Sequence, residues 1–372
     1  MNNKKKVSFF LPSFRTGGSE KIFIELANHL HINFEYDIEM VCVNNEGKLK
    51  NIINKNIRII NLKKNSVSES ILPFIRYLRD SNSKIIISSM SHCNIMVIIS
   101  KLISRSKTKI IVRECSSIYV KILPFSLNIK KRIIKLLMKI LYKKADYVIS
   151  NSLDLAKHLK KELNLKKVKV IYNGYELERI KELSLEEPSQ NFFNNQKVIV
   201  SVGRLSHEKG LDFLIKAFKI VRKELDCKLI ILGEGPLKKI LLNLSKDLCL
   251  EKDIHFLGYQ KNPYPYIKKS NIFVLPSIIE GLPGALIQAL ILNKNIISTN
   301  CKFGPREILK NGKLGKLIPI KDKKRLAKEI INELNNPSTI KKQIDLDLDR
   351  FHMKNIVKKY NLLFKELTKP NI

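Results

Sequence analysis

Residues 197–225, KVIVSVGRLSHEKGLDFLIKAFKIVRKEL, contain the pattern that decides the fold. The run KVIVSV is apolar and has no polar alternation, which predicts a strand buried on both faces of a sheet. After the loop that ends at Gly210, apolar residues recur at helical spacing from Leu211 to Leu225. A buried strand followed by a loop and an amphipathic helix is the repeating unit of a parallel α/β sheet.

The same unit recurs on both sides of this stretch. Further strands are predicted at 6–11, 36–43, 84–89, 109–113, 147–150 and 168–172, and then at 227–232, 253–257, 272–275 and 295–298. Helical patterns lie between them, for example at 20–30, 154–163 and 237–248. Because the series occurs twice, the sequence predicts two doubly wound, Rossmann-like α/β domains that face a cleft beyond the carboxyl ends of their strands.

The domain boundary is predicted from a change in composition. The stretch 182–196 is polar and aperiodic and contains a proline, which is typical of a linker. We therefore expect a first domain at 1–181 and a second domain at 196–350.

Length and charge narrow the class of protein. The chain has 372 residues, enough for two domains of ordinary size, and no apolar run long enough to span a membrane. Its N-terminus does not have the pattern of a signal peptide. The net charge of +35 favours polyanionic partners. An AT-rich genome, whose codons favour lysine, would also raise the net charge. Nucleic acid is disfavoured as a partner because no recognised binding motif occurs.

Two loops at predicted strand ends suit a phosphate group. Gly17 and Gly18 follow the first strand and open a helix, where backbone amides can face an anion. Arg204 and Lys209, in the loop VGRLSHEKG, place two cations at the end of a strand, as a diphosphate requires. The alternative for the glycine pair is an ordinary capped turn between a strand and a helix. The alternative for the two cations is solvated surface charge.

The segment 276–288, PSIIEGLPGALIQ, carries the strongest signal. Glu280 lies at the mouth of this predicted loop, where a carboxylate can accept hydrogen bonds from sugar hydroxyls. A helix is expected to begin at about Gly284, and Gln288 would lie about one turn into it. The candidate phosphate cradle at this helix N-terminus is formed by Gly281, Leu282, Pro283 and Gly284.

In this order and spacing, the loops resemble the family-4 retaining glycosyltransferases, which have the GT-B fold. The resemblance covers roughly residues 5–365 and rests on GGSE (17–20), ADYVISNS (145–152), VIYNG (170–174), GRL…KG (203–210), ILGEGPL (231–237) and FVLPS…EGLP (273–283). The segment 298–309, STNCKFGPREIL, is similar to a branch of bacterial surface-polysaccharide enzymes. That branch often transfers hexoses or N-acetylhexosamines from UDP donors.

The resemblance implies roles for the donor-side residues. Arg204 and Lys209 would hold the diphosphate, Glu280 would hold hydroxyls of the donor sugar, and the turn at 17–18 would close over the phosphates. Where the family has a second glutamate that grips the ribose hydroxyls, this chain has Gln288. An uncharged amide accepts a weaker hydrogen bond, so we expect weaker nucleotide binding with retained chemistry, and Glu307 is a candidate to compensate.

The resemblance also implies a mechanism. It predicts a retaining hexosyltransferase that needs no metal or cofactor, with the acceptor attacking from the leaving-group face and the donor phosphate taking the proton. The DxD-like stretch 345–349 is interpreted as solvated surface. The last helix, in about 351–372, is expected to cross back to the first domain. One alternative is that the donor is GDP-mannose. The other, suggested by Gln288, is that the protein is a catalytically impaired GT-B binding subunit.

Two residues of the first domain are candidates for the acceptor side. His92 follows the predicted strand 84–89, and Glu114 follows the strand 109–113, so both are expected to face the cleft. By the resemblance, Glu114 occupies roughly the place of an acceptor-side histidine or acid. The alternative for Glu114 is a structural ion pair with Arg113 or another neighbour.

The segment 121–144 is basic and amphipathic. It contains eight Lys or Arg and no Asp or Glu, and its apolar residues at 129, 133, 136, 137, 140 and 141 share one helical face. Such a helix suits an anionic membrane surface, which a lipid-linked glycan acceptor would explain. The alternative is a domain helix with its apolar face buried. We expect a cytoplasmic protein, peripheral on the inner face of the plasma membrane.

Overall fold

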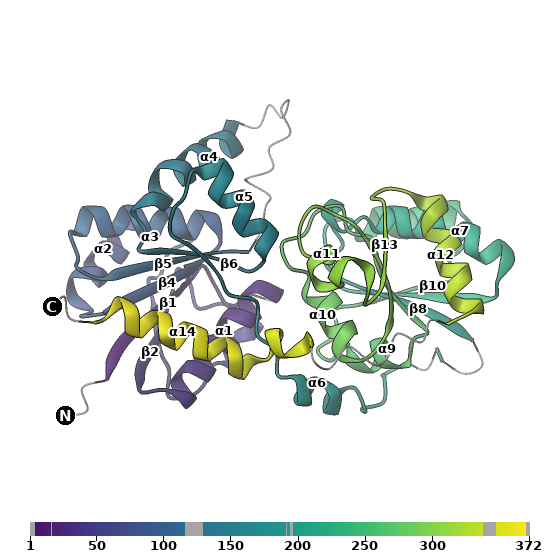
Figure 1. Cartoon of the computed structure of the whole chain (residues 1–372), viewed down its shortest axis with the longest axis horizontal. Coiled ribbons are helices and arrows are strands. Elements are labelled where there is room, and N and C mark those ends of the chain that lie inside the picture. The colour runs from purple at the N-terminus through teal and green to yellow at the C-terminus, as the bar shows by residue number, and fades with distance from the viewer. Residues whose placement is uncertain are drawn as a thin grey trace. The chain divides into compact units, whose positions relative to one another are not determined.

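The computed structural model describes residues 4–15, 17–115, 129–190, 192–193, 196–337 and 347–369. The chain divides into two compact units, the first made of Met1–Tyr175 and Arg350–Ile372 and the second of Glu176–Asp349 (Figure 1). The boundary falls ahead of the stretch 182–196 that the sequence suggested, because α6 (Leu177–Leu183) packs on α9 (Tyr264–Lys269) and α10 (Gly284–Ile291) of the second unit.

The first unit is built on a seven-stranded sheet in which all neighbouring strands are parallel. The strand order is β3-β2-β1-β4-β5-β6-β7. The strands are β1 (Lys5–Leu11), β2 (Tyr36–Cys42), β3 (Arg58–Asn61), β4 (Ile85–Ser89), β5 (Lys109–Glu114), β6 (Tyr147–Ser150) and β7 (Val168–Val170). The central strand β1 is buried from Val7 to Leu11, and it pairs with β2 along its whole length, from Lys5 opposite Tyr36 to Leu11 opposite Cys42.

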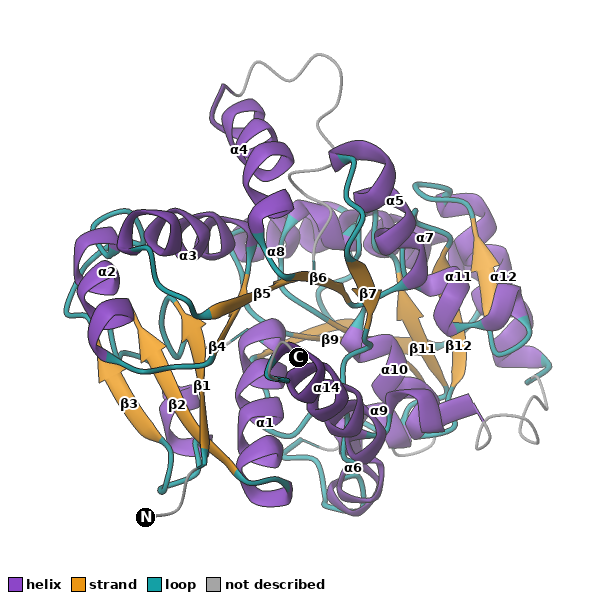
Figure 2. Cartoon of the chain, turned by 60° about the vertical axis from the view of Figure 1, so that its left-hand side comes forward, coloured by secondary structure: helices purple, strands orange, loops and turns teal. Residues whose placement is uncertain are grey.

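The C-terminal helix completes the core of the first unit. Helices α1 (Gly18–Asn33) and α14 (Met353–Leu367) lie side by side against one face of the sheet (Figure 2). Phe364 is fully buried there and meets the ring of Tyr36 edge-on at 5.4 Å. Asn361 accepts a hydrogen bond from the Tyr36 hydroxyl at 2.7 Å. These contacts hold the last helix on the first unit, although the helix is far in sequence from the strands that it covers.

The remaining helices of the first unit are α2 (Ile71–Asp80), α3 (Ser91–Ser104), α4 (Ile129–Leu141) and α5 (Leu153–Leu163), together with the 3-10 turns η1 (Lys48–Ile52) and η2 (Tyr142–Lys144). Phe74 of α2 packs edge-on against Phe10 of β1, with ring centroids 5.0 Å apart. Helix α3 packs against both α2 and α4.

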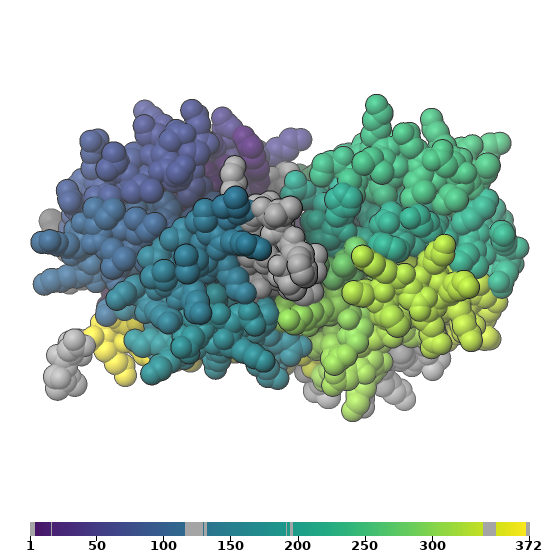
Figure 3. Space-filling view, turned by 90° about the horizontal axis from the view of Figure 1, so that it is seen from above, coloured from purple at the N-terminus to yellow at the C-terminus, as the bar shows by residue number. Residues whose placement is uncertain are grey.

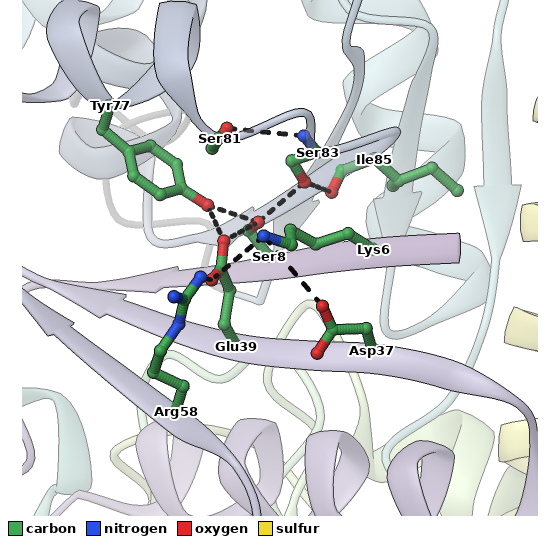
Figure 4. A network of polar contacts seen from close by, with 9 residues as sticks. All are labelled: Lys6, Ser8, Asp37, Glu39, Arg58, Tyr77, Ser81, Ser83 and Ile85. Atoms are coloured by element: carbon green, nitrogen blue, oxygen red, sulfur yellow. Dashed lines mark hydrogen bonds and ion pairs between the residues drawn. The ribbon is translucent and has the colours of Figure 1, made fainter. Parts of the chain in front are cut away.

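A buried carboxylate ties α2 to the sheet near the amino-terminal half of β1 (Figure 4). Glu39 is 1% exposed, and its carboxylate accepts hydrogen bonds from Ser8 Oγ, the Tyr77 hydroxyl and Arg58 Nη2. The Arg58 bond is a 2.6 Å ion pair, which offsets the cost of burying the charge. Burial and the Glu39 charge raise the pKa of Tyr77, so its hydroxyl keeps its proton and remains a donor.

The second unit contains a six-stranded parallel sheet in the order β10-β9-β8-β11-β12-β13. The strands are β8 (Lys197–Val202), β9 (Cys227–Leu232), β10 (Ile254–Gly258), β11 (Ile272–Leu275), β12 (Asn295–Thr299) and β13 (Lys316–Ile318). Helices α7 (Leu211–Glu224), α8 (Lys238–Asp247), α11 (Pro305–Ile308) and α12 (Lys323–Asn335) accompany α6, α9 and α10, with the turns η3 (His207–Lys209) and η4 (Lys310–Gly312). The turn η5 (Asp349–Phe351) spans the boundary where the chain returns to the first unit. Leu214, Phe218 and Ile330 are fully buried in its core, where α7 and α12 meet.

The predicted fold class, two doubly wound parallel α/β sheets, is confirmed. The strands at 147–150, 197–202, 227–232 and 272–275 have the predicted bounds. The sequence pattern missed the edge strands β3 and β13, which are short and only partly buried. A half-exposed edge strand of three or four residues lacks the continuous apolar run that marks a central strand.

Candidate functional site

The best-formed candidate site lies at the topological switch point of the second sheet. Strands β8 and β11 are neighbours, and the strand order runs in opposite directions from them. The loops that follow these two strands therefore leave the sheet side by side and in opposite directions, which is where doubly wound proteins bind ligands. We call residues 203–210 and 276–283 the switch-point loops.

The switch-point loops are joined through their backbones. The Ile278 amide donates to the Glu208 carbonyl at 2.8 Å. Gly210 has a φ of +62°, and a Cβ at this position would lie 2.4 Å from the Pro276 carbonyl oxygen. Only glycine satisfies both constraints without moving the neighbouring backbone, so Gly210 fixes how closely the two loops approach.

A third loop, which follows β9, packs beneath the first. Gly233 has a φ of +139°, and an added Cβ would lie 1.9 Å from the Gly203 carbonyl oxygen. The Leu205 amide donates to the Glu234 carbonyl at 2.9 Å, and the Leu237 amide donates back to Leu205 at 3.0 Å. The motifs GRL and GEGP are thus one backbone-bonded unit that holds the loop after β8 in place.

A lysine and a carboxylate meet where the switch-point loops join. Lys209 Nζ lies 2.6 Å from Glu280 Oε1, and Ser277 Oγ donates to the same oxygen at 2.7 Å. The Glu280 side chain is 9% exposed and that of Lys209 is 23% exposed, so the pair is partly shielded from water. Glu280 Oε2 has no hydrogen-bond partner among the described residues and can accept one from a ligand hydroxyl.

Arg204 and the start of α10 supply hydrogen-bond donors that have no acceptor elsewhere in the described chain. Arg204 is exposed, and its guanidinium has no hydrogen bond or ion pair with any described residue. Helix α10 begins at Gly284 after Pro283, and no side chain caps it. Its first amides are therefore left to bind water or an anion. Gln288, four residues into this helix, is half-buried, and its side chain has no hydrogen bond to a described residue.

The loop after β12 approaches the same helix start. Gly304 has a φ of +89°, and a Cβ there would lie 2.5 Å from Pro283 Cδ and 2.9 Å from the Gly281 carbonyl oxygen. Glu307 belongs to the short helix α11, which packs on α10. The segment GPREIL is thus placed beside the predicted phosphate cradle at 281–284.

The predicted glycine turn at 17–18 follows β1, one of the two strands, β1 and β4, at the switch point of the first unit. Gly17 caps the start of α1, and the Glu20 carboxylate folds back within 2.2 Å of where a Gly17 Cβ would lie. A Cβ on Gly18 would meet nothing within 4 Å, so the structure gives no steric reason for a glycine there.

The turn before α3 has strained backbone. Met90 has φ 76° and ψ 134° at the N-cap of α3, a region that L-residues rarely adopt. His92 follows in the first turn and is half-buried, and this burial lowers its pKa. The imidazole is thus neutral at pH 7, and its unprotonated ring nitrogen can accept a hydrogen bond. The strained Met90 has no signature in the sequence.

Glu114 is buried within a hydrogen-bond network of the first unit. Its Oε2 accepts from Ser91 Oγ at 2.8 Å and from the Tyr142 hydroxyl at 2.9 Å. The alternative of an ion pair with Arg113 is wrong, because successive residues of a strand point to opposite faces. Arg113 is fully buried on the other face and donates to Asn173 Oδ1 at 2.5 Å.

Among the described residues, no group of three or more His, Cys, Asp or Glu side chains is placed to hold a metal ion. Within the DxD-like stretch, Asp345 lies outside the described residues, and Asp347 pairs with Lys310 at 2.6 Å. No helix in the described ranges is long and apolar enough to cross a membrane.

The two units match two family models. Residues 16–179 match the model "Glycosyltransferase Family 4", and residues 184–346 match the model "Glycosyl transferases group 1". The chain belongs to the family-4 glycosyltransferases.

Individual relatives span either half or most of this glycosyltransferase. An uncharacterized glycosyltransferase of Methanocaldococcus jannaschii is 44% identical over 186 residues, which is 48% of this chain and 45% of that protein. A Campylobacter jejuni protein is 29% identical over 327 residues, 85% of this chain and 86% of its own. It is named N-acetylgalactosamine-N,N'-diacetylbacillosaminyl-diphospho-undecaprenol 4-alpha-N-acetylgalactosaminyltransferase.

Solved structures share the fold of the glycosyltransferase at low sequence identity. Sucrose-phosphate synthase from Thermosynechococcus elongatus superposes with a TM-score of 0.81 at 16% identity, over 98% of this chain and 99% of that one. Anabaena HepE in complex with UDP and glucose gives a TM-score of 0.79 at 19% identity, over 97% and 99%. These likenesses confirm the GT-B fold.

Proposed function

We propose that this glycosyltransferase moves a hexose or N-acetylhexosamine, with retention, from a UDP-sugar to a lipid-linked or polysaccharide acceptor in surface-glycan synthesis. The observation that carries the proposal is the Lys209–Glu280–Ser277 cluster beside the uncapped start of α10. This arrangement offers cationic and amide donors for a diphosphate next to a carboxylate acceptor for sugar hydroxyls.

The proposed reaction exchanges one C–O bond for another. The bond from the anomeric carbon to the donor phosphate breaks, and a bond from the acceptor oxygen to the same carbon forms on the same face. The acceptor proton passes to the departing phosphate oxygen. Arg204, Lys209 and the first amides of α10 would stabilise the charge that develops on the diphosphate, so no metal or cofactor is required.

The acceptor and donor classes draw support from relatives. The Campylobacter relative is named for an undecaprenol-diphosphate-linked acceptor, and HepE was solved with UDP and glucose. We propose the same classes here, with His92 on the acceptor side and Glu114 holding Ser91 at the start of α3. Such an acceptor would place the enzyme on the cytoplasmic face of a membrane.

A thermal-shift panel of UDP, GDP, ADP, UDP-N-acetylhexosamines and GDP-mannose, run without metal, tests the donor class. A ligand at a hundredfold excess over its Kd stabilises the folded protein by about 2.7 kcal/mol. We expect stabilisation by UDP compounds and its loss in Arg204→Ala. Stabilisation by GDP-mannose alone would reassign the donor, and no shift with any nucleotide would indicate an impaired binding subunit.

Gln288→Glu tests the nucleotide end of the site. If Gln288 binds the ribose, a carboxylate there should tighten UDP binding about fivefold, because a charge-assisted hydrogen bond replaces a neutral one. Calorimetric titration with UDP measures the change, and Gln260→Glu, in the same unit, is the control. An unchanged Kd in Gln288→Glu would remove Gln288 from the ribose site.

A further inference from the structure

Helix α4 (Ile129–Leu141) turns an apolar stripe outward. Ile129 is 70% exposed, Ile133 50%, Leu136 58% and Ile140 53%. Their spacings of four, three and four residues place them in one row along the helix. We call these four residues the α4 stripe. A soluble domain would bury such a row, and single exposed leucines elsewhere do not form one.

The opposite side of α4 holds the helix on the first unit. Met138 is fully buried and Leu141 is 9% exposed, and Lys135 pairs with Glu162 of α5 at 3.1 Å. The helix is therefore already packed through a different face, and the α4 stripe faces away from it. The sequence-based alternative, in which the whole apolar face packs inward, is wrong for these four residues.

Basic side chains border the α4 stripe. At 100° per residue, Arg132 and Lys139 lie next to it on one side, and both are exposed. Lys143 and Lys144, just beyond the helix, are also exposed. Helix α4 has no acidic residue, and the nearby Asp146 is engaged by Lys101 and Lys109. In Figure 3 this segment, blue to teal, lies at the surface of the first unit. The rest of the basic run, 121–128, lies outside the described residues.

We infer that α4 inserts its stripe into the interface of an anionic bilayer while Arg132, Lys139, Lys143 and Lys144 contact the lipid headgroups. The outward apolar residues can contact the upper part of the acyl chains, and the cations that border them can contact the anionic headgroups above. A second copy of the chain fits less well, since two-fold pairing through the stripe would bring the basic borders of both copies together. The inference rests on the proposed function and deepens it, since the lipid-linked acceptor proposed above would lie at that surface.

The chain contains no tryptophan, so a single substitution makes a specific reporter of insertion. Leu136→Trp places the indole in the stripe, and Leu362→Trp places it at a 66% exposed position of α14 as the matched control. With vesicles of phosphatidylcholine and phosphatidylglycerol, we expect a blue-shifted Leu136→Trp emission that brominated acyl chains quench. Leu362→Trp should not change.

Several outcomes would overturn the inference. Vesicle binding without a blue shift at position 136 would mean contact through charge alone. A blue shift without lipid, together with dimers in sedimentation, would mean self-association. In flotation, Ile133→Gln/Leu136→Gln should bind anionic vesicles at least about tenfold more weakly, whereas Leu72→Gln, at a 69% exposed position of α2, should not. Equal binding by the wild type, the double variant and the Leu72→Gln variant would contradict insertion.

The UDP thermal shift, measured on the same proteins, separates this inference from the proposed function. The stripe variants should retain the UDP response of the wild type, because the α4 stripe lies in the other unit. Absence of a nucleotide response in the wild type would refute the donor proposal and leave the vesicle result standing.

Discussion

At the scale of single residues, Lys209 is the cation on which the buried side of the proposed donor site depends. Without it, the nearly buried Glu280 would keep only the Ser277 hydrogen bond. We expect Lys209→Ala to lower the free energy of unfolding by about 1–3 kcal/mol, measured by urea denaturation, because a shielded carboxylate then lacks its counter-ion.

A double-mutant cycle distinguishes this pair from general loss of charge. Adding Glu280→Gln to Lys209→Ala should recover part of the loss, since the uncompensated charge is removed. Lys216→Ala, which breaks the exposed pair with Asp212, is the control and should change stability little. Additive effects of the two site substitutions would mean that Lys209 and Glu280 do not interact.

His92 gives the first unit a pH dependence. Burial lowers its pKa in the folded chain, so near pH 6 the unfolded chain binds more protons. The free energy of unfolding should therefore fall as the pH drops below about 6.5, the ordinary histidine value. His92→Gln should lose less stability than the wild type between about pH 7 and pH 5 in chemical denaturation. Parallel pH profiles for the two proteins would contradict this prediction.

At the scale of elements, α14 is a structural part of the first sheet rather than a terminal extension. Phe364 is fully buried against Tyr36, whereas Leu362 on the same helix is 66% exposed. Phe364→Ala should cost about 3–5 kcal/mol through the cavity it leaves. Leu362→Ala should stay within about 0.5 kcal/mol. Equal effects of the two substitutions on urea unfolding would mean that α14 is not docked as described.

At the scale of the whole molecule, each unit has its own hydrophobic core and can respond on its own. Scanning calorimetry of the intact chain should show that Phe364→Ala lowers the transition of the first unit. UDP should raise the transition of the second unit by mass action. A single transition that moves equally in both experiments would mean that the units unfold as one.

The sequence by itself determined the parallel sheets and the positions of the switch-point loops, because both depend on local patterns. Central strands are buried on both faces and carry continuous apolar runs, and the loops at 203–210 and 276–283 are marked by their glycines and charges. Local patterns do not show which residues, distant in sequence, a side chain contacts in the folded protein. Only the tertiary structure decided that Glu280 pairs with Lys209, that Glu114 is buried with Ser91 and Tyr142, and that Met90 is strained.

The same reason explains α4. Its periodicity showed an apolar row, but periodicity does not reveal which side of a helix faces the core. That depends on which of its faces the neighbouring helices cover, and they cover the side of Met138 and leave the α4 stripe exposed.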